Sequence, residues 1–149
     1  MCPASIFTPW ELLRFAEGLL KKCFKDFLLR MKKIYHLSTC STCQRILKEL
    51  KPGKEYILQD IKTEPITASQ LKELCDQAGN YERLFSRVAL KYRALGLNEK
   101  KLTEKDYRDY ILKEYTFLKR PVIVINDQIF IGNAPKNIVA AKEAMKSNR

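Results

Sequence analysis

The stretch Lys33-Ile-Tyr-His-Leu-Ser-Thr-Cys-Ser-Thr-Cys43 decides the fold. Its first part, residues 33–37, is a short apolar run of strand-forming residues, and residues 38–42 form a polar turn rich in residues that cap helices. The pattern then predicts a helix over residues 43–50, with Ile46, Leu47 and Leu50 on one face, that ends at Pro52-Gly53. The stretch therefore predicts a strand followed directly by a helix, with two cysteines at the junction.

These two cysteines form the motif Cys40-Ser-Thr-Cys43. A cysteine at a helix N-terminus faces unpaired backbone N–H groups and the positive end of the helix dipole, so we expect its pKa to fall below about 8.5. Cys43 lies one turn further on, so the pair can alternate between dithiol and disulfide, with Cys40 attacking and Cys43 resolving. A zinc site would need two more ligands, and Cys75 and His36 lack the motif spacing for it. Inert thiols are the third alternative, and we favour redox chemistry without a metal.

The remainder of the chain continues to alternate between strands and helices. The predicted segments are a strand over 55–61 with Tyr56 and Leu58 on one face, a helix over 67–77, short helical pieces over 81–97, a helix over 103–116, a strand over 121–125, a returning strand over 129–131 and a helix over 135–146. The order is β-α-β, a helical insertion, and β-β-α. It predicts an α/β fold with a thioredoxin-like mixed sheet and helices on both faces.

Composition limits the classes of protein that the chain can represent. Its 149 residues are 46% apolar and 30% charged, which excludes disorder and indicates one globular domain. No stretch of 18 residues lacks charge, so we expect no membrane span. The net charge of +11 indicates either anionic partners or a solvated basic surface, and we expect no direct sequence-specific binding of nucleic acid. Five cysteines, an odd number, and no secretion signal predict a reducing, cytoplasmic location.

Residues 1–30 differ from the rest of the chain. After Pro9, apolar residues recur at steps of three and four, which predicts an extra N-terminal helix. Three interpretations stay open: a native start at Met31, a helix packed on the domain, or a helix that docks on a partner or a membrane surface. We therefore divide the chain into a helical extension, 1–30, and a thioredoxin-fold domain, 31–149.

Other candidate site residues lie outside the cysteine motif. In the thioredoxin architecture, a proline at the position of Pro121 is usually cis and faces the active cysteine, and Arg120 would place a permanent cation beside the thiolate. The alternative is a proline that starts a strand next to a solvated arginine. His36 is the only histidine, and it either positions the active loop or is structural. A basic cluster in the helical insertion, which is either solvated or binds an oxyanion or an acidic protein, comprises Arg83, Arg87, Lys91 and Arg93.

With these residues placed, the chain from Met31 to about Met145 resembles the ArsC/Spx family of thioredoxin-fold proteins. Three markers agree in order and spacing: the opening stretch, Ser86-Arg-Val-Ala-Leu-Lys-Tyr-Arg-Ala-Leu-Gly96, and Leu118-Lys-Arg-Pro-Val-Ile-Val124. The long helical insertion between the second and third strands also separates this family from generic thioredoxins and glutaredoxins.

The resemblance implies roles for individual residues. In the family's glutaredoxin-linked arsenate reductases, the cysteine at the position of Cys40 attacks arsenate. A histidine at the position of His36 and arginines at those of Arg87 and Arg120 tune the cysteine and hold the oxyanion. These reductases carry a third arginine where this chain has Asn133, and they do not use a CxxC motif, whereas Spx carries one as a thiol-disulfide switch.

The sequence therefore predicts a thiol-dependent oxidoreductase of the arsenate reductase-like kind, with Cys40 as nucleophile and Cys43 as resolving thiol. The resemblance implies no bound cofactor and an external thiol donor, either glutathione with glutaredoxin or thioredoxin. The alternative is a Spx-like redox-sensing regulator that binds the α subunit of RNA polymerase without turnover. A family fold with neither activity is the third interpretation.

Overall fold

The computed structural model describes residues 32–148. The predicted N-terminal helix and the question of a start at Met31 lie outside the described residues. The strands are β1 (Lys32–His36), β2 (Ile57–Asp60), β3 (Val122–Ile125) and β4 (Gln128–Ile131). The helices are α2 (Ser41–Leu50), α3 (Ala68–Ala78), α4 (Tyr81–Leu84), α5 (Leu90–Ala94), α6 (Glu104–Lys113) and α7 (Pro135–Ser147), with short 3-10 helices η1 (Leu97–Glu99) and η2 (Tyr115–Phe117).

The four strands form one mixed sheet in the order β2-β1-β3-β4. β1 pairs with β2 in parallel, and β3 pairs antiparallel with both β1 and β4. In this register, Ile34 of β1 lies between Leu58 of β2 on one side and Ile123 of β3 on the other. The α/β fold with a mixed sheet that the sequence predicts is confirmed.

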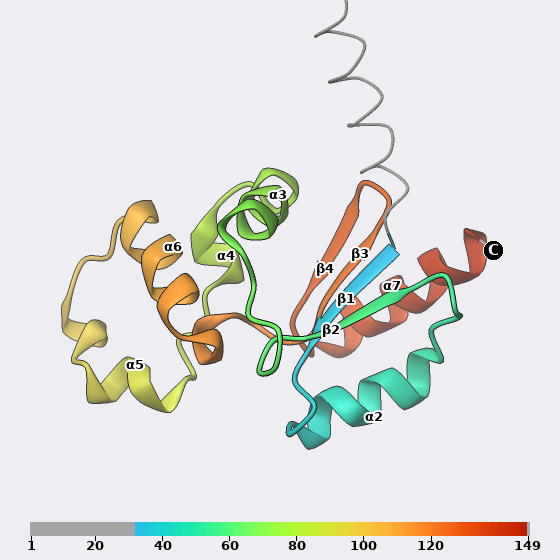
Figure 1. Cartoon of the computed structure of the whole chain (residues 1–149), viewed down its shortest axis with the longest axis horizontal. Coiled ribbons are helices and arrows are strands. Elements are labelled where there is room, and N and C mark those ends of the chain that lie inside the picture. The colour runs from blue at the N-terminus through green and yellow to red at the C-terminus, as the bar shows by residue number, and fades with distance from the viewer. Residues whose placement is uncertain (1–31, 149) are drawn as a thin grey trace, which may run out of the picture.

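Alternating side chains of the central strands build two separate cores, one on each face of the sheet. Ile34 and Ile123 pack with buried residues of α2 and α7, such as Ile46 and Ile138. Figure 1 shows α2 and α7 lying next to each other on that side. On the opposite face, the side chain of Tyr35 packs into a core with residues of the helical insertion. Both faces are therefore covered by helices.

The insertion between β2 and β3 forms a helical block, α3 to η2, to one side of the sheet (Figure 1). Thr67 and Thr103 begin α3 and α6 with complete capping boxes, whose partners are Gln70 and Asp106. Phe85 lies at the centre of the block's aromatic contacts, with its ring stacked on that of Phe117 at a centroid distance of 5.1 Å.

A short antiparallel bridge joins this block to the segment that precedes β3. Phe85 pairs with Leu118, the Lys119 N–H donates to the Leu84 carbonyl at 2.8 Å, and the Ser86 N–H donates to the Phe117 carbonyl. This bridge brings residues 83–87 next to residues 119–120, although more than thirty positions separate them in the sequence.

The second strand is shorter than predicted. The sequence predicts a strand over residues 55–61 with Tyr56 and Leu58 on one face, but β2 begins only at Ile57, and Leu58 is 48% exposed whereas Tyr56 is buried. The physical reason is that β2 is an edge strand with a neighbour on one side only, so it lies at the margin of the core.

Candidate active site

The first thiol of the site belongs to Cys40, the N-cap residue of α2. Its backbone is extended, with φ −95° and ψ 114°, and no side-chain oxygen caps the helix. The first-turn amides are therefore free to donate to sulfur. Partial burial by itself raises the pKa of Cys40, but the backbone N–H groups of Cys43 and Thr42, the Cys43 thiol and the charge of Arg120 together hold it below its usual value. A thiol with a lowered pKa at this position is an activated nucleophile.

The second thiol, Cys43, has the opposite character. Its side chain is 1% exposed and packs into the core on the helical-block side of the sheet. Burial raises its pKa to about 11, and the neighbouring Cys40 thiolate acts in the same direction. Both cysteines are free thiols, and each influences the pKa of the other. The arrangement fits an accessible attacking thiol beside a protected thiol that reacts only when its partner is modified.

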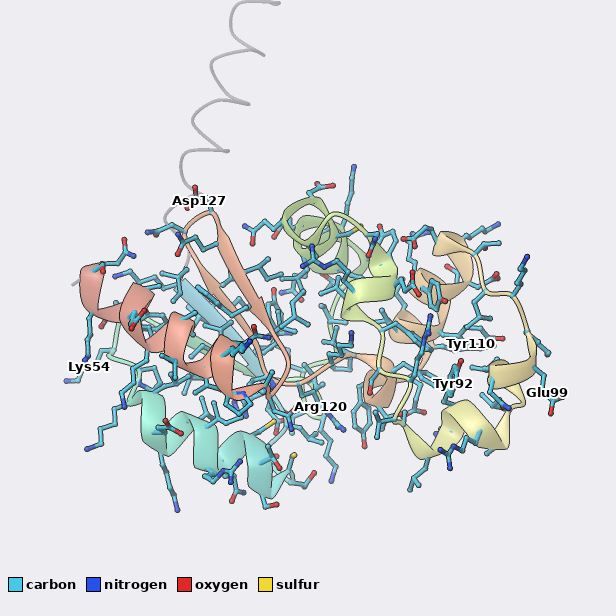
Figure 2. The ribbon with its side chains drawn as sticks, turned by 180° about the vertical axis from the view of Figure 1, so that it is seen from behind. Lys54, Tyr92, Glu99, Tyr110, Arg120 and Asp127 are labelled. Carbon is cyan, nitrogen blue, oxygen red and sulfur yellow. The ribbon has the colours of Figure 1, made fainter. Side chains whose placement is uncertain are left out.

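Arg120 and Pro121 lie opposite the start of α2. The peptide bond between them is cis, and Pro121 is buried while Arg120 is half-buried. Figure 2 shows Arg120 where the sheet, the start of α2 and the helical block meet. The Pro121 carbonyl accepts from the N–H of Gly132 at 2.9 Å, which holds the loop after β4 against the same place. The positive charge of Arg120 therefore acts directly on Cys40.

These groups open into one cavity of about 660 Å³. Cys40, Arg87 and Arg120 all line it, so the structure brings together three of the predicted site residues. Asn133, an uncharged residue, lines it too. The remaining lining residues are Thr42, Glu82, Arg83, Phe85, Ser86, Val88, Lys119 and Gly132.

Arg87 is already engaged in contacts within the protein. Its guanidinium forms a salt bridge with Glu82 and donates to the Tyr107 hydroxyl at 3.3 Å. The hydrogen bond to Tyr107 is the main reason that the pKa of Arg87 is raised. These contacts position the cation at the cavity wall, and Glu82 places one carboxylate beside it.

His36 does not line the cavity. It ends β1, and its Nδ1 is buried without a hydrogen-bond partner among the described residues. The nearby Asp60 accepts hydrogen bonds from the Ser38 and Lys62 N–H groups. The Ser38 side chain is the largest cause that lowers the pKa of Asp60, and these two N–H groups lower it further. His36 thus lies beside the loop that leads to Cys40, and its predicted role stays a prediction.

The sequence predicts one basic cluster in the insertion, and the structure divides its members between different places. Arg83 and Arg87 line the cavity, whereas Lys91 pairs with Glu114. Lys119, which directly precedes Arg120, also lines the cavity, and it is not among the site residues that the sequence predicts. The only signal that could have found it is the run of two adjacent cations before a proline.

Among residues 32–148, no group of three or more His, Cys, Asp or Glu side chains is placed to hold a metal ion. No helix in the same range is both long enough and apolar enough to cross a membrane.

The model of the ArsC family matches residues 35–141, which include the cysteine motif, the helical block and β3–β4. The chain belongs to the ArsC family. Among curated relatives, the arsenate reductase of Escherichia coli (strain K12) is 28% identical over 93 residues, which are 61% of this chain and 66% of that enzyme. This alignment therefore spans slightly less than two thirds of the relative's length.

Solved structures of ArsC-like proteins share the fold. A possible arsenate reductase from Streptococcus mutans UA159 is 29% identical, with a TM-score of 0.56 over 70% of this chain and 92% of that one. An arsenate reductase from Vibrio cholerae has a TM-score of 0.62 over 74% of this chain and 98% of that one, at 19% identity. These likenesses confirm the thioredoxin-like ArsC fold.

Proposed function

We propose that this ArsC-family protein is a thiol-dependent oxidoreductase in which Cys40 attacks the substrate and Cys43 resolves the adduct. The observation that carries the proposal is the pairing of an activated thiol, Cys40, with the cations of one cavity. The cations would hold an anionic substrate and stabilise the charge that shifts during attack. Family membership and the curated name of the Escherichia coli relative support an arsenate reductase-like reaction.

Arsenate is the first substrate to consider, and its reduction can be written as a balanced sequence. The Cys40 thiolate bonds to arsenic, and an arsenate oxygen leaves as water after protonation. The Cys43 thiolate then attacks the Cys40 sulfur, the sulfur–arsenic bond breaks, and its electron pair stays on arsenic, which leaves as arsenite. The protein now holds a disulfide, having supplied two electrons.

An external thiol donor must then reduce this disulfide. Glutathione with glutaredoxin, or thioredoxin, would supply two thiols and leave as the oxidised partner. We propose no bound cofactor, because the two cysteines and the donor account for both electrons.

The decisive experiment is arsenate reduction coupled to each donor system. The wild-type protein should turn over, Cys40→Ser should abolish turnover, and Cys75→Ser, a matched loss of a thiol that does not line the cavity, should preserve it. Turnover that persists in Cys40→Ser would contradict the proposed role of Cys40.

The identity of the resolving thiol has its own test. Mild oxidation with diamide should link Cys40 to Cys43, because the N-cap residue Cys40 and Cys43 lie within one turn of α2, and should leave Cys75 reduced. Peptide mapping by mass spectrometry identifies the linkage. A dominant disulfide to Cys75 would exclude Cys43 as the resolving thiol.

A second candidate function is the Spx-like regulator without turnover. Two observations favour it. Asn133 lines the cavity without adding a charge. Val88, which also lines the cavity, and Leu90, two positions further along the chain, are each 92% exposed, as a surface for a protein partner would be. A pull-down with purified polymerase α subunit tests it, with Val88→Ser as the interface variant. Binding that Val88→Ser weakens, together with no turnover of arsenate, would favour the regulator.

A further inference from the structure

The cavity at Cys40 is larger than a compact tetrahedral oxyanion requires. Its volume of about 660 Å³ lies within the range of pockets for organic ligands, about 300–1,000 Å³. Its lining carries four cations and one carboxylate, and the carboxylate, Glu82, is already paired with Arg87. The cavity therefore has space and positive charge beyond what the thiol and a single oxyanion would use.

The two additional cations, Arg83 and Lys119, are held in place by the bridge between the helical block and the segment before β3. The Lys119 N–H donates to the Leu84 carbonyl at 2.8 Å, which fixes the backbone of Lys119 against α4. The Arg83 guanidinium donates to the carbonyl of Ala78, also at 2.8 Å, which orients it at the C-terminal end of α3. The two side chains thus come from opposite sides of the bridge and line the same wall.

A second, smaller hollow adjoins this wall. It has a volume of about 240 Å³, and Arg83 and Lys119 line it as well as the main cavity. Ile129, Phe130 and Ile131 of β4 supply an apolar side to it. Neither Cys40 nor Arg120 lines this hollow. The two cations therefore lie between the thiol end of the cavity and a partly apolar recess.

Lys119 lacks a counter-charge of its own. No hydrogen bond or salt bridge from its Nζ exists among residues 32–148, and its side chain is half-buried. Burial lowers its pKa, and the charges of Arg87 and Arg83 lower it further, while Glu82 alone opposes them. An anionic group bound at this position would compensate the ammonium.

We propose that Arg83 and Lys119 form a second anion-binding subsite, which binds a carboxylate of an organic substrate while the substrate's reacting atom meets Cys40. The substrate class is a small disulfide that carries a carboxylate on its chain. The Cys40 thiolate attacks one sulfur, the S–S bond breaks, and the departing thiolate takes the electron pair, leaving a mixed disulfide on Cys40. This inference rests on the proposed role of Cys40 as nucleophile, and it adds a subsite that selects the substrate.

The test compares two disulfides that differ in charge at the end of each arm: the dianion dithiodipropionate and the neutral bis-hydroxyethyl disulfide. In Cys43→Ser protein the mixed disulfide on Cys40 is trapped, so its rate of formation can be followed by mass spectrometry without turnover. At about 0.15 M salt the Debye length is about 8 Å, which suppresses steering by distant charges. The readout is the ratio of the two rates, dianion over neutral.

We expect Lys119→Met and Arg83→Met each to lower this ratio about tenfold, since a charge-assisted hydrogen bond exceeds a neutral one by about that factor. Lys119→Arg, which keeps the positive charge, should retain most of the parent protein's ratio of dianion rate to neutral rate. Lys48→Met is the matched control, because it removes the same charge from an exposed position on α2 outside the cavity, and it should change the ratio less than about twofold.

A ratio that is equal in the parent, Lys119→Met and Arg83→Met proteins would overturn the subsite. An equal fall in Lys48→Met would do the same, because it would show that net charge alone is sensed. If the wild-type protein shows no arsenate turnover but Lys119→Met lowers the ratio of the dianion rate to the neutral rate, the proposed arsenate reaction is overturned and the subsite is supported. The two failures are therefore distinguishable.

Discussion

Alkylation of the reduced protein at pH 7 should modify Cys40 far faster than Cys43. Burial raises the pKa of Cys43 to about 11, whereas the α2 amides, the Cys43 thiol and Arg120 outweigh partial burial and hold the pKa of Cys40 below its usual value. A pKa of about 11 lies more than two units above that of a free thiol, about 8.5, so at neutral pH the thiolate fraction of Cys43 is at least about a hundredfold below that of an ordinary thiol. Only the thiolate reacts with the alkylating agent.

Intrinsic nucleophilicity reduces this difference but does not reverse it. A more basic thiolate reacts faster, with a Brønsted coefficient of about 0.4–0.5, so nearly half of the logarithmic advantage is lost. An advantage of roughly tenfold for Cys40 remains. The 1% exposure of the Cys43 side chain adds to it, because the reagent must reach the sulfur.

The assay is timed labelling with iodoacetamide between pH 6 and pH 10, followed by peptide mapping. Cys75 provides an internal comparison, because burial raises its pKa as well. The Cys40 rate should level off at a lower pH than the rates of the other two described thiols. Equal labelling of Cys40 and Cys43 at pH 7, or faster labelling of Cys43, would refute the argument from the start of α2.

Three further predictions concern the cations and the helical block. Arg120→Met should raise the pKa of Cys40 and slow its labelling at pH 7, which the same pH series measures. Asn133→Arg should raise arsenate turnover by up to about tenfold, because it adds a charge-assisted contact of about 1.5–3 kcal/mol where a neutral one contributes about 0.5–1.5 kcal/mol; steady-state kinetics beside wild type would show it. Thr103→Ala removes the capping box of α6 and should lower the free energy of unfolding by about 1 kcal/mol in a urea titration.

Much of the fold follows from local pattern. The apolar run at residues 33–37, the β-branched run at residues 121–125 and the capping residues Thr67 and Thr103 each determine their element through neighbours a few positions away. The exposure of Leu58 shows the limit of such local reasoning. It depends on the place of β2 at the sheet edge, which only the assembled sheet determines.

The site, like the fold, is predictable from the sequence only where it depends on neighbouring positions in the chain. Cys40 and Cys43 are close because they lie on one turn of a helix, so their different chemistry follows from the motif itself. The position of Arg120 beside the Cys40 thiolate is predicted only through the resemblance to a known architecture. Arg83 and Lys119 meet through a long-range bridge that no short sequence pattern encodes, so sequence reasoning could not place both at one cavity wall.

We expect the bridge between Phe85 and Leu118 to open before the central strands of the sheet do. It consists of few hydrogen bonds outside any regular strand, whereas β1 and β3 lie in the interior of the sheet. Local opening of this bridge would separate Arg83 and Arg87 of the helical block from Lys119 and leave the start of α2 intact. Amide hydrogens of Ser86 and Lys119 should therefore exchange with solvent before those of β1, and mild denaturant should remove charge discrimination before it removes the reactive thiol.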